Sequence, residues 1–431
     1  MSTISRRSLI QLAGLTGVGL TLSACAGPGT TTQPGGGAAG AVNLTGPVEG
    51  SISFAHWRGE DKAQFDSIIA AFVAANAGVE VRQDISPSND YNANALQQIR
   101  QGTQGDLFAA FRGAQYESMV KASLFADLTK DGPTDKYVAN LIGAGTTDGK
   151  QYGYPYQLVF NMPLINADLR AQAGYTANPK DWNGFLDLCE KLKSSGVVPI
   201  AWPGGEAGNA GQLFNAMVMN EAPSDDMCAQ IEAGTMKVTD DWFLTVLRRY
   251  EELKPYFQPN ATGTAVEPAQ QMFASGQSAM LATGSYHMTS VRGLGATFGF
   301  DLIAPITTTA DKAKYEGIHN ATFILGVSTV SKNASTAFAL LKHLSDPKAA
   351  GDYANGTSQH VTVKDVQYTN PDLLATAPWL ERKTLLAPRF QFTNLDIRNA
   401  AEGAATAVVG GTSVDEAAAS AQRIIDQRVK R

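Results

Sequence analysis

The chain is poor in the residues from which metal sites and catalytic centres are usually built. It has three cysteines and five histidines in 431 residues, and the histidines do not have metal-ligand spacing. There is no H-E-x-x-H, G-x-S-x-G or C-x-x-C motif, and Gly149-Lys150 is followed by Gln151, which rules out a Walker loop. Nothing singles out a pair of carboxylates suited to glycoside cleavage. The sequence therefore predicts no catalytic residues, no metal and no cofactor.

Positive charge and long hydrophobic runs are also scarce. The net charge is −6 and the basic residues are scattered, which argues against nucleic acid as a partner. The composition, 44% apolar and 17% charged, is that of a soluble globular protein, and no hydrophobic segment of membrane length follows the amino-terminal region. About 385 residues remain beyond that region, a length that suggests two domains.

The first 25 residues have the pattern of an export signal. Arg6-Arg7 is the mark of a twin-arginine signal, and the apolar stretch from Leu9 to Leu22 is too short and too glycine-rich to span a bilayer. The stretch ends in Leu22-Ser-Ala-Cys25, which resembles the lipobox of bacterial lipoproteins, where the cysteine thiol receives a diacylglyceryl group. The resemblance implies an extracytoplasmic protein that is anchored to the cell membrane through Cys25.

Residues 26–46 are predicted to be a flexible tether. They are mostly Gly, Ala, Thr, Pro and Gln, and such a segment has a root-mean-square reach of roughly 25 Å. Residues 35–40 satisfy G-x-G-x-x-G, but no strand precedes them and no amphipathic helix follows, so a dinucleotide site is rejected. With Cys25 lipidated, Cys189 and Cys228 are left, and the sequence leaves open whether they pair.

The folded part begins with an alternation of strands and helices. Strands are predicted at 51–55, 79–84 and 106–111, with helices between them, the first of which begins with Glu60 and Asp61 and buries Phe65, Ile68, Ile69 and Phe72. This βαβαβ order implies a mostly parallel sheet covered by helices on both sides. Ligands of such sheets bind beyond the carboxyl ends of the strands. The residues expected there are His56, Trp57, Arg58, Phe111 and Arg112.

The run Gln151–Asn161 is predicted to be a strand that leaves one lobe, bends near Pro155 and enters a second lobe at about Val159. Residues Tyr152, Tyr154, Tyr156, Leu158 and Phe160 fall on one face of it, and Gln157 falls on the other. Tyrosine offers a flat apolar face and a hydroxyl, and glutamine a donor and an acceptor. We expect Tyr152 and Phe160 to be in the core, and Tyr156 and Gln157 to face a cleft.

Further elements lie beyond this crossing. Strands are predicted at 197–201, 276–283, 298–303 and 321–327, and the last of these is read as the return crossing to the first lobe. Helices are predicted to begin at about residues 181, 240, 267, 335, 347 and 413. Trp202 follows a buried strand and precedes two glycines, so we expect its ring at the ligand. His319 and Asn320 stand at the entrance of the return crossing and are added to the candidate site.

Several segments together resemble the extracellular solute-binding proteins of sugar-transporting ABC importers, the family that includes maltose-type binding proteins. They are Tyr152-Gly-Tyr-Pro-Tyr, Pro179-Lys-Asp-Trp-Asn-Gly-Phe-Leu, Ser195-Gly-Val-Val-Pro-Ile-Ala, and Met272-Phe-Ala-Ser-Gly-Gln-Ser-Ala-Met with Gly284-Ser-Tyr. The resemblance implies an α/β fold of two lobes joined by crossing strands, with the ligand in the cleft. One lobe would comprise 47–158 and 328–378, and the other 159–327 and 379–431.

The resemblance also implies a function and a set of ligand contacts. A monomeric receptor would capture a mono- or oligosaccharide by hinge closure and deliver it to a membrane permease. The family's aromatic sugar platforms fall on Trp202 and on Tyr286, which stands where the family commonly has Trp. With them, Trp57 and Tyr156 would supply faces, and Arg58, Arg112, Gln157 and Asn320 hydrogen bonds.

Two alternatives stay open from the sequence. One is a binding protein for an anionic solute such as a glycerol phosphate ester, in which Arg58, Arg112 and Arg389 would meet the charge. The other is a lipid-anchored enzyme that cleaves glycosides.

Overall fold

The computed structural model describes residues 42–429, which lie within one compact unit formed by residues 39–431. The predicted signal peptide, with Arg6, Arg7 and Cys25, and the tether up to residue 41 lie outside the described residues. Within residues 42–429, no helix combines the length and the apolar character needed to cross a membrane.

The larger of two main sheets has seven strands in the order β12-β6-β11-β3-β1-β2, with β13 beside β11. The strands β1, β2 and β3 pair in parallel, as the alternation predicts, whereas β11 runs antiparallel to both β3 and β6. The bounds are β1 Gly50–His56, β2 Val79–Ile85, β3 Leu107–Ala110, β6 Tyr154–Phe160, β11 Gly317–Val327, β12 His360–Val361 and β13 Thr384–Leu386.

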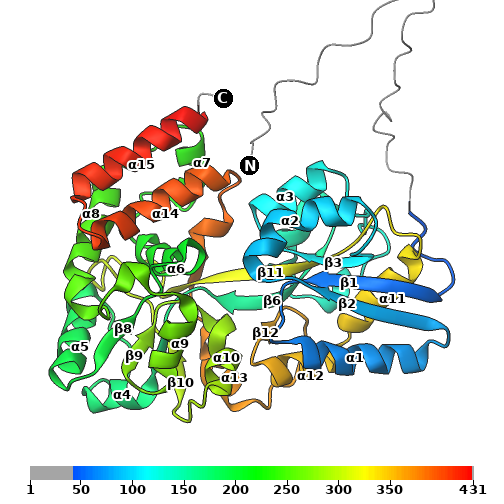
Figure 1. Ribbon diagram of the computed structural model, residues 1–431, viewed down its shortest axis with the longest axis horizontal. Coiled ribbons are helices and arrows are strands. Elements are labelled where there is room, and N and C mark those ends of the chain that lie inside the picture. Colours follow the sequence, from blue (N-terminus) through cyan, green and yellow to red (C-terminus); the bar gives the residue numbers. More distant parts are fainter. Residues whose placement is uncertain (1–41, 430–431) are drawn as a thin grey trace, which may run out of the picture. The chain divides into compact units, whose positions relative to one another are not determined.

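Helices cover the parallel part of this sheet, and Figure 1 shows α2 and α3 on one side of it and α1 and α12 on the other. The face predicted for the first helix is confirmed, since Phe65, Ile68, Ile69 and Phe72 are buried. The helix begins later than expected, at Lys62, because Asp61 pairs with Arg58 instead of lying in the first turn. The bounds are α1 Lys62–Ala75, α2 Ser88–Arg100, α3 Ala114–Lys121, α11 Ala334–Leu344 and α12 Pro347–Thr357.

The second sheet has four strands in the order β10-β7-β9-β8, and a second hydrophobic cluster surrounds it. Its strands are β7 Leu164–Asn166, β8 Val198–Ala201, β9 Ser278–Leu281 and β10 Phe300–Leu302. The helices of this part are α4 Ala167–Gln172, α5 Trp182–Ser194, α6 Ala207–Val218, α7 Met227–Glu232, α8 Asp241–Leu253, α9 Val266–Ala274, α10 Met288–Gly293, α14 Leu395–Val409 and α15 Val414–Val429. The short helix α13 Pro371–Thr376 contacts β10 from the segment that follows α12.

Local sequence explains where several of these helices begin. The α5 helix starts after Asp181, whose carboxylate accepts a hydrogen bond from the backbone N–H of Gly184, as a residue at the N-cap should. Asn394 caps α14 in the same way. The apolar periodicity of α5 predicts that Trp182, Phe185, Leu186, Cys189 and Leu192 face inward. All of these are buried except Leu186, which is partly buried, and Leu188 is buried as well. Cys189 and Cys228 are both buried and free.

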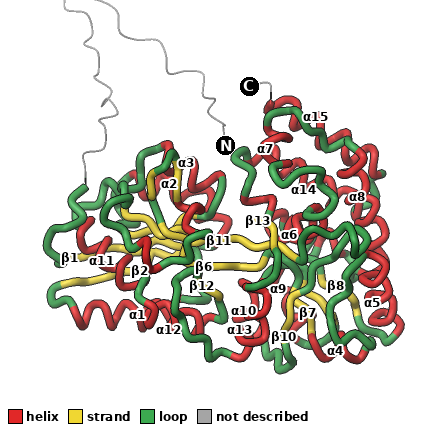
Figure 2. The backbone as a smooth tube through the Cα atoms, turned by 180° about the vertical axis from the view of Figure 1, so that it is seen from behind, coloured by secondary structure: helices red, strands yellow, loops and turns green. Residues whose placement is uncertain are grey.

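The strands β6 and β11 lie side by side over most of their length and connect the two parts of the fold (Figures 1 and 2). Their pairing is regular except at Phe323. Thr322 pairs with Gln157 and Ile324 with Pro155, while Phe323 itself has a left-handed backbone with φ of 55°. A bulky residue rarely adopts this conformation, so the crossing contains a locally strained residue next to a proline that cannot donate to the ladder.

Candidate ligand-binding site

A cavity of about 800 Å³ opens at the carboxyl ends of the parallel strands, a size typical of small-molecule sites. The loops after β1, β2 and β3 form one wall. The strands β6 and β11 contribute Gln157, Val159, Asn161, Asn320 and Thr322. The opposite wall comes from α6, α9, the turn at Ser285–His287, and the segment from Arg389 to Arg398. Both parts of the fold therefore contribute side chains to one cavity.

The floor of the cavity is a polar strip along the two crossing strands. Val159 lies opposite Asn320, and Gln157 lies opposite Thr322. Several buried atoms of this strip have no hydrogen-bond partner among the described residues: Asn161 Oδ1, Asn320 Oδ1 and Nδ2, and Thr322 Oγ1. Because buried polar groups are nearly always paired, a cluster of unpaired ones around a cavity indicates that a polar ligand completes them.

A chain of hydrogen bonds fixes one end of this strip. Gln157 Nε2 donates to Tyr353 Oη, which donates to Asp61 Oδ2 over 2.6 Å. Asp61 in turn accepts two bonds from the Arg58 guanidinium, at 2.7 and 3.0 Å. Burial alone would lower the pKa of Arg58, but the charges of Asp61 and Glu60 raise it above its usual range. Four residues from three segments, the loop after β1, β6 and α12, are thus held in one arrangement beside the cavity.

Aromatic side chains lie on both walls. The ring of Trp57 stacks on Phe111 with a centroid separation of 3.6 Å and an interplanar angle of 22°, and both residues line the cavity. Tyr286 lines the opposite wall, where its hydroxyl donates to Asn209 Oδ1 over 3.4 Å. Burial raises the pKa of Tyr286, so its hydroxyl stays protonated and able to donate. The cavity therefore combines flat apolar faces with amides and hydroxyls.

Seven of the ten residues expected to contact a ligand line this cavity: Trp57, Arg58, Phe111, Arg112, Gln157, Tyr286 and Asn320. Arg389, which would contact the ligand under the anionic-solute alternative, also lines the cavity. Their contact with a ligand stays a prediction. The cavity brings them together from both parts of the fold.

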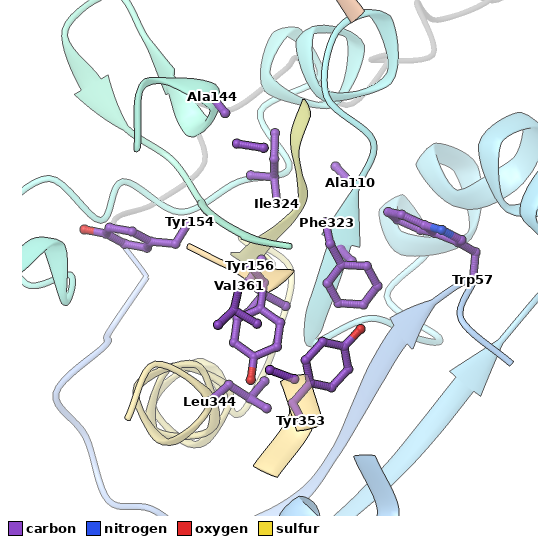
Figure 3. Close-up of a cluster of buried hydrophobic side chains, with 14 of the residues drawn as sticks. Trp57, Ala110, Ala144, Tyr154, Tyr156, Phe323, Ile324, Leu344, Tyr353 and Val361 are labelled. Carbon is purple, nitrogen blue, oxygen red and sulfur yellow. The ribbon is translucent and has the colours of Figure 1, made fainter. Parts of the chain in front are cut away.

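The other three residues lie elsewhere, so their assignment to the cavity wall is corrected. Tyr156 is fully buried on the opposite face of β6 and packs against Tyr353, with Phe323 beside the pair (Figure 3). Trp202 is fully buried as well, because its ring stacks on Phe257 and its Nε1 donates to the carbonyl oxygen of Ala210.

His319 belongs to the junction with β13, where its Nδ1 lies 2.9 Å from Thr384 Oγ1. Burial, with a smaller effect from the charge of Arg112, lowers the pKa of His319 to about 4. The imidazole is therefore neutral near pH 7, and it is held by a threonine outside the cavity.

Other lining residues were not selected from the sequence. Asn161 and Thr322 follow the period-two pattern of Gln157 and Asn320, so strand alternation was a usable signal for both. Gln212, which accepts a hydrogen bond from Asn161, and Arg398 lie on helices and have no such signal. Among residues 42–429, no group of three or more His, Cys, Asp or Glu side chains is placed to hold a metal ion.

The family model for bacterial extracellular solute-binding proteins matches residues 57–351 of this sequence. The chain belongs to this family. The matched range ends within α12, and it includes both crossing strands and most of the residues that line the cavity of this solute-binding protein.

One curated relative of the solute-binding protein is the alpha-glucosides-binding periplasmic protein AglE of Rhizobium meliloti (strain 1021). It is 30% identical over 173 residues, which are 37% of this chain and 36% of the relative. The aligned region thus spans about a third of the relative's length.

Solved structures share the two-lobed fold over most of the chain. A chitin oligosaccharide binding protein has a TM-score of 0.75 at 20% identity, covering 88% of this chain and 99% of the other. The protein RafE in complex with raffinose has a TM-score of 0.74 at 15% identity, covering 88% and 98%. These similarities show the two-lobed α/β architecture that the sequence predicted.

Proposed function

We propose that this solute-binding protein is the carbohydrate receptor of an ABC importer. The observation that carries the proposal is the strip of unpaired amide and hydroxyl groups on β6 and β11. Sugar hydroxyls both donate and accept hydrogen bonds, so they suit Asn320, whose amide offers one donor group and one acceptor without partners among residues 42–429. The aromatic faces of Trp57 and Tyr286 would pack against the C–H faces of a pyranose.

The names of similar proteins support the same class of ligand. The curated relative is described as binding alpha-glucosides, and the two solved structures are described with chitin oligosaccharide and raffinose. We therefore propose a saccharide as the ligand because of the chemistry of this chain's own cavity, and the ligands named for these three similar proteins support that class.

Capture would occur by closure of the two lobes around the sugar. A ligand that touches both walls favours the closed form through contacts that the open form lacks. We place the hinge in the crossing strands, where Phe323 has its left-handed backbone opposite Tyr156 and next to the Pro155 position. The lobes are proposed as residues 47–158 with 328–378, and 159–327 with 379–431.

The receptor is further proposed to act as a monomer outside the cytoplasm. Cys25 would carry the lipid that anchors it, and residues 26–46 would tether it to the membrane surface. The closed form would then dock on the permease of the importer.

Calorimetry and a thermal-shift screen over mono- and oligosaccharides test the ligand class. We expect saturable binding of a saccharide with its concentration unchanged after incubation, because a receptor binds without turnover. Binding of glycerol phosphate esters, with no response to any saccharide, would contradict the carbohydrate proposal. Release of cleavage products from a bound oligosaccharide would contradict the receptor role.

A further inference from the structure

Four arginines line the cavity, and they fall into two classes. Arg58 is paired with Asp61 and with Glu60 Oε1 at 2.8 Å. Arg389 is paired with Glu402 Oε2 at 3.3 Å and also donates to the carbonyl oxygen of Gly208. These two guanidinium groups are thus neutralised by the protein itself, and their role is to hold the cavity walls in place.

Arg112 and Arg398 have no such partner. Neither forms an ion pair with a carboxylate among the described residues, and the side chain of Arg398 donates only to Asn399 Oδ1. Burial lowers the pKa of Arg112 to about 10. Burial and the charge of Arg389 lower the pKa of Arg398 to about 10, against a smaller opposing effect of Glu402, whose carboxylate is bound to Arg389. Both remain charged near neutral pH, so each is a half-buried cation without a counter-ion.

The carboxylates of the cavity wall do not fill this role. Glu60 is bound to Arg58, and Glu206 accepts from the backbone N–H of Val266 and from Asn209. The remaining two, Asp90 and Glu267, have exposed side chains that water can solvate. A buried charge is costly unless it is paired, so an arginine left unpaired beside a cavity favours an anionic group on the ligand.

The segments that carry the two arginines meet beside the cavity. Arg112 stands next to Gly113, where an added Cβ would lie 3.0 Å from the carbonyl oxygen of Phe390. The loop carrying Arg112 therefore packs tightly against the segment 389–398, which contains Arg398 and contributes to the cavity wall. One arginine thus comes from each of two segments that are in contact.

We propose that the saccharide bound here carries an anionic oxygen group, which Arg112 and Arg398 bind from opposite lobes. This inference rests on the proposed carbohydrate function and makes it more specific: the ligand is an acidic saccharide, with a carboxylate or a sulfate ester on the ring. Guanidinium groups bind both anions through paired N–H donors, and an anion held by both lobes would stabilise the closed form.

The test compares acidic saccharides with matched neutral ones by calorimetry. One arm uses di- and trisaccharides that contain uronic acid, each beside its carboxyl-reduced counterpart. The other arm uses sulfated disaccharides beside their desulfated forms. In the wild-type protein we expect an acidic member to bind about 10- to 100-fold more tightly than its neutral counterpart. The arm in which this preference occurs identifies the anion.

The variants Arg112→Gln and Arg398→Gln should each reduce this preference, because the affinity for the acidic member should fall more than the affinity for its neutral counterpart. Arg112→Lys should keep part of it, since the charge remains but the forked donor set is lost. The matched control is Arg248→Gln, which removes one charge from an exposed position of α8 outside the cavity and should keep the full preference. Circular dichroism and melting temperature establish that each variant is folded.

Equal binding of neutral and acidic members in the wild-type protein would overturn the inference, and so would a preference that survives in both glutamine variants. In either case the carbohydrate function would stand. If no saccharide of either charge binds, the carbohydrate proposal itself fails.

Discussion

Replacing Asn320 with leucine should have opposite effects on stability and on binding. The side chain is fully buried, and neither its Oδ1 nor its Nδ2 has a partner within residues 42–429. A buried polar group without a partner costs about 1–3 kcal/mol, and leucine has a similar volume without the polar atoms. Asn320→Leu should therefore raise the free energy of unfolding of the ligand-free protein, by up to about 2 kcal/mol.

The same change should weaken sugar binding. Two ligand hydrogen bonds would be lost at about 0.5–1.5 kcal/mol each, which corresponds to roughly a 5- to 150-fold increase in the dissociation constant. Urea unfolding without ligand gives the first quantity, and calorimetry with the best saccharide of the screen gives the second. A matched control is Thr336→Val, since the Thr336 hydroxyl is also buried but is paired with the backbone of Glu49, so this variant should lose stability and keep its affinity. A less stable Asn320→Leu protein with unchanged affinity would refute the reasoning.

Three further predictions concern the surroundings of the cavity. Tyr353→Phe removes the hydroxyl between Gln157 and Asp61, so it should lower the free energy of unfolding by about 1–3 kcal/mol and weaken binding. The control is Tyr250→Phe, whose hydroxyl has no partner among the described residues and whose loss should have neither effect. Urea unfolding and calorimetry of both variants test this prediction. Trp202→Ala should lower the free energy of unfolding by about 3–5 kcal/mol but leave the affinity of the folded protein nearly unchanged. A large loss of affinity at normal stability would show instead that Trp202 contacts the ligand. Acid should also destabilise the fold, because burial lowers the pKa of four histidines below the ordinary value of 6.5. The pKa falls to about 3 for His287, and to about 4 for His56, His319 and His360. The unfolded chain then binds more protons than the folded one, so stability should fall from pH 6.5 toward pH 4, by about 1.4 kcal/mol per pH unit for each fully buried histidine; a flat series of urea midpoints would contradict this.

Much of the fold was accessible from the sequence because its elements have strong local patterns. The first helix has a regular apolar face, and the strands β1 and β3 contain short buried runs, whereas β2 has only alternating valines, so their order implied a parallel sheet. The carboxyl ends of those strands then indicated where His56, Trp57, Arg58, Phe111 and Arg112 would gather. The structure places the last four at the cavity, whereas His56 is buried against Phe54 and Phe65 and does not line it.

The errors concern orientation, which local patterns do not determine. Strand alternation correctly placed Tyr156 and Gln157 on opposite sides of β6, but alternation does not determine which of the two sides lies against the core. Tyr156 on the aromatic face packs against Tyr353 of α12, and Gln157 and Val159 on the polar face line the cavity. Trp202 follows its strand as expected but turns into the second hydrophobic cluster, because Ala210 and Phe257 come close through distant parts of the chain.

Arg398 could not be found in this way. It lies on α14, more than 280 residues from Arg112, and its role depends on forming no ion pair, because the nearby Glu402 is bound to Arg389. The classification of the four arginines into paired and unpaired groups likewise required side-chain distances, since all four look alike in the sequence.

The order of pairing in the large sheet has a consequence for how the chain reaches its native state. The strand β3 has β1 on one side and β11 on the other, and the first residue of β3, Leu107, pairs with Val327. The second part of the fold is completed later still, since the last helix, α15, packs on α8 and α14. During synthesis, β3 therefore has an open edge until β11 has been made, and the second hydrophobic cluster is incomplete until nearly the whole chain has been made. Such long-range pairing slows folding and leaves nascent chains prone to aggregation, so a truncated product should be a target for proteases and not a working half-receptor.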